Sequence, residues 1–188
     1  ITASAPVAVL GGHMCPFVPP GIAACNTLVE QLPSVETLGT EYLVTPFAVR
    51  GSGYLLRVVA ATSGTEVRID GALVATLARG TFHELDEPAQ AAHVVTTSQP
   101  SLVTQYAKGI AAESDPLVTE GDPVMLVVVP AEQFDNGATV STVPDHEWTR
   151  FDGVRAIEET WSYDSYLNVV VPTADAGGVR VDGAPVAA

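Results

Sequence analysis

The sequence predicts an all-β protein of two related antiparallel β-sandwich-like units, with one short helix near the N-terminus. Val-rich apolar runs of strand length recur along the chain, and a total of 16 Gly and 14 Pro supplies turns between them. One segment of 22 residues also occurs twice. Since 188 residues suffice for one large β domain or two small ones, we expect three regions: residues 1–38, 39–109 and 110–188.

Residues 1–38 are expected to pack on the β units. Residues 6–10, PVAVL, predict a first strand, and a segment with two cysteines follows it. Residues 26–33, NTLVEQLP, start with the possible N-cap Asn26 and stop at Pro33. This pattern predicts the short helix, of one or two turns.

The two cysteines, Cys15 and Cys25, lie close together in a segment rich in Gly and Pro, where a flexible loop can bring the sulfurs together. We interpret them as a disulfide. Closing so short a loop stabilises by roughly 3 kcal/mol in the chain-entropy model, and it places the protein in an oxidising compartment. The alternative is two buried free thiols in a cytosolic protein.

The first unit, residues 39–109, is predicted from a series of strand patterns. These are EYLVTPFAV, YLLRVVAAT, TEVRIDGALVATL, TFHEL and a strand pair in 92–109 that turns near 98–100. Within the third pattern, Asp70 and Gly71 predict a type I′ hairpin turn, because both of its central residues need positive φ.

The second unit, residues 110–188, opens with an apolar run at 124–129 that predicts a strand covered on both faces. Residues 131–163 have weak periodicity and predict a long loop with one or two short strands. Trp148, Phe151 and Trp161 lie in this loop and are its candidate ligand contacts. A strand at 166–174 and a hairpin turning at Asp182 and Gly183 complete the unit.

The repeat aligns residues 54–75 with 166–187 without a gap, and 11 of the 22 positions are identical. Both copies hold the Asp-Gly pair and an Arg two residues before it. In the first copy further strands follow the hairpin, whereas the second copy stops there, so we expect the second unit to be truncated at its C-terminus. An open sheet edge of that kind invites strand addition.

The charge of the chain restricts its partners. Lys and Arg number 8 against 22 Asp and Glu, a net charge of −14, which disfavours nucleic acid and anionic membranes. No apolar run approaches the ~20 residues that span a bilayer, so no membrane insertion is expected. The chain starts without Met or a basic n-region, so either a leader has been removed or the sequence was trimmed. We expect a protein that is extracellular or at the cell surface, after removal of a signal peptide.

The sequence contains only incomplete catalytic motifs. We therefore expect no catalytic residue and no cofactor. His83-Glu84 and His146-Glu147 lack the second His of a zinc protease helix, and Ser52 lacks the flanking pattern of a nucleophile elbow. His13 beside Cys15 is a loop histidine or, less plausibly, a metal ligand. Clusters of carboxylates, such as the one at 84–87, favour solvated turns; if calcium binds, residues 113–122 are the first candidate.

Four segments carry a family resemblance: GHMCPFVPPGIAACNTLVEQLP, GTEYLVTPF, PSLVTQYAKG and GDPVMLVVVPAEQF. Taken in this order, from about residue 6 to about residue 183, they resemble the N-terminal domain of IgG Fc-binding protein and its bacterial and invertebrate relatives. The resemblance implies a secreted or surface-displayed domain of large modular proteins, without established catalytic residues. Immunoglobulin binding belongs to the animal member and does not transfer by resemblance alone.

The predicted function is therefore a non-catalytic binding or adhesion module at the cell surface or outside the cell, part of a larger modular protein. Its ligand is expected to be a protein or a glycan. The alternative is a structural building block that self-associates through an open β edge, and a hydrolase is the least favoured class.

Overall fold

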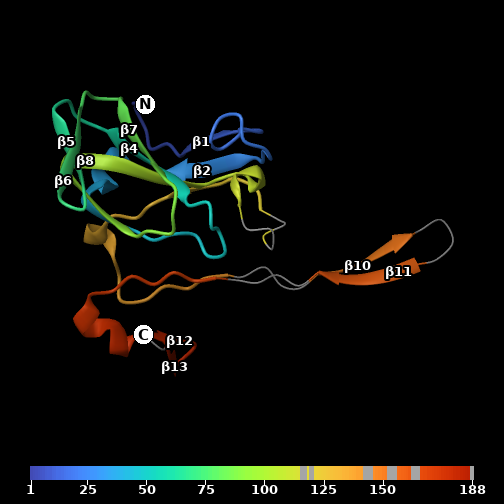
Figure 1. Ribbon diagram of the computed structural model, residues 1–188. Helices are drawn as coiled ribbons and strands as arrows, with labels where there is room; N and C mark the ends of the chain where they lie inside the picture. The colour runs from blue at the N-terminus through green and yellow to red at the C-terminus, as the bar shows by residue number, and fades with distance from the viewer. Residues whose placement is uncertain (115–117, 119–120, 142–145, 152–155, 162–165, 187–188) are drawn as a thin grey trace. The chain divides into compact units, whose positions relative to one another are not determined.

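The computed structural model describes residues 1–114, 118, 121–141, 146–151, 156–161 and 166–186 (Figure 1). The chain is mostly antiparallel β, as the sequence predicts. It divides into two compact units, Ile1–Asp135 and Asn136–Ala188, which we describe separately. The predicted boundary at 109/110 differs from this division because the strand at Val124–Val127 pairs within the first unit.

The first unit holds nine strands in the described residues. They are β1 (Val9–His13), β2 (Leu28–Leu32), β3 (Gly39–Val44), β4 (Tyr54–Ala60), β5 (Thr65–Ile69), β6 (Ala72–Leu77), β7 (Phe82–Glu87), β8 (His93–Ala107) and β9 (Val124–Val127). Three 3₁₀ turns accompany them: η1 (Val35–Thr37), η2 (Ile110–Ala112) and η3 (Ala131–Gln133). Strands β3 to β9 form one sheet, and β1 pairs with β2 alone.

The 15-residue strand β8 organises the sheet. Its first half pairs with β3 and β5, and its second half pairs with β4 and β9. Strand β6 extends the sheet from β5, and β7 extends it from β4. The sheet therefore curls into two halves that share β8.

The change of partners along β8 falls at residues 98–100, which are exposed and have no partner in these ladders. Pro100 lacks an N–H and is suited to such a position. The prediction of two strands joined by a turn is wrong here, because the backbone continues as one strand through this point.

A core fills the space between the two halves. Alternate strand residues point inward, and eleven of them form one buried cluster with Val128, which follows β9; Tyr42 is 1% and Tyr54 0% exposed. The Tyr42 hydroxyl donates to the Ser101 carbonyl and accepts from the Gly39 N–H at 3.0 Å. The Tyr54 hydroxyl donates to the Ala91 carbonyl at 2.8 Å. Both buried hydroxyls are thus satisfied, as burial of a polar group requires.

The N-terminal region covers the outer face of one half-sheet. Val18 and Leu28 pack with Leu55 of β4 in a second, smaller buried cluster, against Tyr106 and Met125. Figure 1 shows β1 and β2 as the blue pair beside the curled sheet. The region thereby adds a third layer to part of the sandwich.

Two predictions for this region need correction. The helix expected at residues 26–33 is wrong: Leu28–Leu32 is strand β2, and the nearest helical turn, η1, has three residues. The first strand starts at Val9 rather than residue 6 and runs through Gly11 and Gly12. A Cβ at Gly12 would lie 2.0 Å from the Leu28 carbonyl oxygen, so the close approach of β1 to β2 requires glycine there.

The second unit contains two hairpins in its described part. Strand β10 (His146–Phe151) pairs with β11 (Ala156–Trp161), and β12 (Arg180–Val181) pairs with β13 (Ala184–Pro185). Residues 166–172 form no strand, and the 3₁₀ segment η4 (Thr173–Gly178) follows. The strand expected at 166–174 is therefore wrong, and two related sandwich units are not confirmed. No described helix has the length and apolar character of a membrane span.

Candidate binding surface

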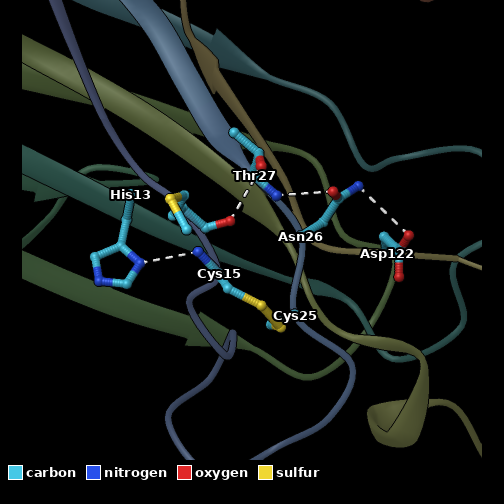
Figure 2. Close-up of a disulfide and its surroundings, with 7 residues drawn as sticks. His13, Cys15, Cys25, Asn26, Thr27 and Asp122 are labelled. Carbon is cyan, nitrogen blue, oxygen red and sulfur yellow. Dashed lines mark hydrogen bonds between the residues drawn. A yellow bond between two sulfur atoms is a disulfide. The ribbon is translucent and has the colours of Figure 1, made fainter.

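The disulfide predicted from Cys15 and Cys25 is confirmed, and Figure 2 shows the loop that it closes. His13, the last residue of β1, accepts a hydrogen bond at Nδ1 from the Cys15 N–H at 3.1 Å. The Thr27 hydroxyl donates to the Met14 carbonyl at 3.0 Å and ties the two ends of the loop together.

The cysteine loop is also held to the sheet. The backbone N–H of Gly109 donates to the Val18 carbonyl at 2.6 Å, and that of Ala111 to the Ala23 carbonyl at 2.7 Å. The Asn26 side chain donates to an Asp122 carboxylate oxygen at 3.4 Å (Figure 2). These bonds join the loop to the segment after β8, so that the disulfide loop forms a fixed part of the domain surface.

The same outer face carries, at the edge of the part that the N-terminal region covers, an arginine between two aromatic rings. The Arg57 guanidinium carbon lies 4.4 Å from the Phe82 ring centre and 5.4 Å from the Tyr106 ring centre. Its Nη2 lies 2.6 Å from the Glu84 carboxylate. We call Arg57, Phe82, Glu84 and Tyr106 the Arg57 patch.

The register of the strands builds this patch. Arg57 of β4 pairs with Glu84 of β7 on one side and with Thr104 of β8 on the other. Phe82 lies two residues before Glu84, and Tyr106 lies two residues after Thr104, so both are on the same face of the sheet as Arg57. Phe82 is 52% exposed, and the Arg57 side chain is 36% exposed. Such an amphipathic Arg-aromatic surface, fixed on strands, has the composition typical of protein interfaces.

A small cavity lies in the described part of the first unit, lined by none of the residues of the Arg57 patch. It has a volume of about 60 Å³ and lies between η1, β9 and η3, with Tyr42, Leu102 and Val128 among its lining residues. Ligand pockets for small molecules are typically several times larger. This cavity is therefore too small for a typical small-molecule ligand.

A polar network lies at the N-terminal end of β8, around His93. His93 contacts the Asp70 carboxylate at 2.7 Å from Nδ1 and the Glu87 carboxylate at 2.8 Å from Nε2. Asp70, the first residue of the β5–β6 turn, also accepts from the Val94 N–H at 2.9 Å. With both ring nitrogens occupied, His93 joins three strands and has no ring nitrogen free to accept a proton from a substrate.

The charges of this network reinforce one another. Burial lowers the pKa of His93, but hydrogen bonds and negative charge from Asp70 and Glu87 outweigh it and raise that pKa. The Val94 N–H, followed by His93, lowers the pKa of Asp70. Burial raises the pKa of Glu87, yet bonds from His93 and the Ala89 N–H lower it overall. The arrangement thus favours a histidine cation between two carboxylates.

The carboxylates at 84–87, expected on a solvated turn, lie on strand β7, and each meets a cation. Glu84 pairs with Arg57, Glu87 with His93, and Asp86 with Lys108 at 2.5 Å. Lys108 is buried and donates to the carbonyls of Ser52 at 2.8 Å and Glu87 at 3.1 Å. All three donors of its ammonium group are thus used in holding strand ends together.

No group of three metal-ligating side chains occurs within the described residues. In the loop proposed for calcium, residues 115–117, 119 and 120 lie outside the described part. Of its described acids, Glu113 accepts from the Ser52 N–H at 2.9 Å and from the Ser52 hydroxyl at 2.7 Å. Calcium binding therefore stays a prediction.

The predicted ligand contacts Trp148, Phe151 and Trp161 lie on the β10–β11 hairpin. The backbone pairs His146 with Trp161 and Trp148 with Glu159, so the hairpin brings two of the predicted residues near one end. Their side chains lie outside the described part, and a role for them stays a prediction. The turn residues Asp70, Gly71, Asp182 and Gly183 all have positive φ, from 49° to 83°.

The Arg57 patch and the His93 network are not predicted from the sequence. Arg57 carries a signal, since it is the single charged residue in the run YLLRVV and must face away from the core. Its partners become visible only when the register of β4 with β7 and β8 is known. The sequence predicts only a turn at Asp70, and nothing in its spacing from His93 predicts their contact.

Comparison with known proteins gives one family. The model of the family described as IgGFc binding protein matches residues 1–188, the whole chain. No curated protein matches significantly. No solved structure matches significantly either.

Proposed function

The chain belongs to the family described as IgGFc binding protein, and from this membership we propose that it is an extracellular protein-binding module whose ligand docks on the Arg57 patch. The family description makes the Fc region of immunoglobulin G the first ligand to test. The disulfide is consistent with an oxidising extracellular setting.

One observation carries the proposal: Arg57 is held over two aromatic rings on a partly exposed face of the sheet. Arg and Tyr are enriched among the residues that dominate protein interfaces, especially where neighbouring groups exclude water. The patch already positions Arg57 through Glu84, so little side-chain entropy would be lost on binding.

The test is surface plasmon resonance of the 188-residue chain against purified IgG Fc. Arg57→Ala and Phe82→Ala should each weaken binding by about 30-fold, the effect of losing an interface residue worth about 2 kcal/mol. Absence of any binding at about 100 μM Fc, where a Kd in the usual range would be detected, would overturn Fc as the ligand.

A matched control is available on the other half-sheet. Arg68 of β5 is 43% exposed and lies 3.2 Å from Glu66, so it resembles Arg57 in exposure and pairing but lies over no described aromatic ring. Arg68→Ala should leave Fc affinity unchanged. Equal losses in the Arg57 and Arg68 variants would indicate a nonspecific charge effect and would refute the assignment of the patch.

A second candidate function, a building block that self-associates through a β edge, is supported by β6. This strand lies at the end of the described sheet, has no charged residue, and exposes Leu73 by 50% and Val74 by 40%. Uncharged apolar edges are prone to pair with other chains. If this function applies, the chain sediments as oligomers, and Val74→Lys makes it monomeric.

A further inference from the structure

The disulfide loop, residues 15–25, packs on the sheet beside the Arg57 patch. Within the loop Val18 is the one buried side chain, 6% exposed. It packs with Leu55 of β4 in the buried cluster against which Tyr106 lies. Tyr106 is also one of the two rings next to the Arg57 guanidinium. The proposed binding patch and the disulfide loop therefore share the cluster around Tyr106.

The loop is also bonded to the backbone just after Tyr106. The Gly109 N–H donates to the Val18 carbonyl at 2.6 Å, and the Ala111 N–H donates to the Ala23 carbonyl at 2.7 Å. The two backbones approach so closely that a Cβ at Gly109 would lie 2.7 Å from the Ala23 carbonyl oxygen. Since Gly109 closely follows Tyr106 in the chain, the loop holds the end of β8 that carries this ring.

Two side-chain hydrogen bonds at the ends of the loop are exposed to water. The Thr27 hydroxyl donates to the Met14 carbonyl at 3.0 Å, and the Asn26 amide donates to Asp122 at 3.4 Å (Figure 2). Such bonds add little stability, because water competes for the same groups. The covalent link, in contrast, favours the closed loop by about 100-fold in the chain-entropy relation. The closed state of the loop thus depends strongly on the disulfide.

The disulfide is accessible to a reductant from solvent. Cys15 is exposed and Cys25 is half-buried, and the chain has no other cysteine. A thiolate of a dithiol can therefore attack the bond directly. In the overall step the S–S bond breaks, the two sulfurs gain two electrons and two protons, and the dithiol is oxidised to a disulfide. The reaction needs no other group of the protein.

We infer that the Cys15–Cys25 disulfide is a redox switch of the Arg57 patch: the oxidised loop orders Tyr106 beside Arg57, and reduction by a dithiol releases both. The inference rests on the proposed binding role of the patch. Loss of the ordered ring should weaken ligand binding by about fivefold, the effect of one cation–π contact. The coupling is reciprocal, so a ligand that prefers the closed loop disfavours reduction by the same factor.

The first measurement needs no ligand. Phenylglyoxal modifies arginine side chains, and peptide mass spectrometry gives its rate at each of them. Reduction of the chain and alkylation of both cysteines with iodoacetamide should raise the rate at Arg57 by about threefold relative to Arg68, because Arg57 loses a ring that shields it. Val18→Ala, which keeps the disulfide, should raise the rate as well. An unchanged rate at Arg57 in either form would overturn the inference.

The second measurement is surface plasmon resonance against purified IgG Fc, with the reductant removed after alkylation so that Fc never meets it. The Kd should rise by about fivefold for the alkylated chain. The double variant Cys15→Ser, Cys25→Ser, which carries no alkyl groups, should show the same rise. Equal Fc affinity of the oxidised and reduced chains would overturn the inference. If the oxidised chain does not bind Fc, the proposed ligand is wrong, and the reactivity of Arg57 alone decides the inference.

Discussion

Removal of the disulfide tests how the N-terminal region is held. The double variant Cys15→Ser, Cys25→Ser opens a loop that closes over a sequence separation of 10. For a closed loop of this size the chain-entropy relation gives about 9 cal/mol/K, or about 2.7 kcal/mol at 25 °C. We expect the free energy that holds the loop in place to fall by this amount.

The structure indicates where the loss will be seen. Val18 and Leu28 pack on Leu55, and the backbone bond from Gly109 to the Val18 carbonyl fixes the loop to the sheet. The core between the two half-sheets does not involve the loop. Loss of the disulfide should therefore promote local opening of the loop before the sheet unfolds.

Amide hydrogen exchange measures this opening directly. Protection of the amides in residues 16–28 should fall by about 100-fold, which is 2.7 kcal/mol expressed as an equilibrium constant. Protection in β4 and β8 should change far less. The wild-type chain in a thiol reductant serves as a control and should match the variant. Protection of the loop within threefold of wild type would refute the reasoning, because the contacts alone would then suffice to hold it.

Three further predictions concern the first unit. Tyr42→Phe leaves the buried Gly39 N–H and Ser101 carbonyl without their partner and should cost about 1–3 kcal/mol in urea unfolding. Gly53→Ala should lower the free energy of unfolding by more than about 1 kcal/mol, since the φ of Gly53 is +75° and a Cβ would lie 2.0 Å from the Glu87 carbonyl oxygen. Gly64→Ala is the control and should lower it by less, because Gly64 has a similar φ of +81° but open space around its Cβ position. The His93 network should contribute fully to the free energy of unfolding between pH 4.5, the ordinary pKa of Glu, and pH 6.5, the ordinary pKa of His. Its contribution should fall as rising pH deprotonates His93, whose pKa is raised, and as falling pH protonates Asp70 and Glu87, whose pKa values are lowered. If the free energy of unfolding falls with pH above 6.5 at the same slope in wild type and in His93→Gln, this prediction is contradicted.

The sequence predicts the parts of the fold that local chemistry determines. Alternation of apolar residues identifies β3 to β7, and the Asp-Gly pair at residue 70 identifies the β5–β6 turn, because few other residues tolerate positive φ. The disulfide follows from two nearby cysteines in a flexible segment. In each case the signal lies within about ten residues of the structure that it predicts.

The failures have a different physical origin. Asn26 and Pro33 suggest a helix, but tertiary pairing with β1 overrides that local preference and gives β2. At Pro100 the sequence suggests a turn, whereas β8 exchanges one set of partner strands for another there. The His93–Asp70 contact joins residues 23 positions apart, which a single sequence does not encode in any spacing. In all three cases the missing information is which distant segments pair with each other, and in which register.

The architecture of β8 also explains why a binding surface arises where it does. A strand shared by two half-sheets directs one face of each half into a common core, so each half keeps one outer face. The disulfide region covers the β4–β8–β9 face at Leu55 and Tyr106, but β4 continues beyond it toward Val59, and β7 exposes Phe82 there. Arg57 lies at the boundary between the covered and open parts, where its charge keeps the remaining apolar surface soluble. A protein ligand that displaces water from this boundary would extend the layer that the N-terminal region begins, which is why substitutions at Arg57 and Phe82 should affect binding far more than substitutions at Arg68.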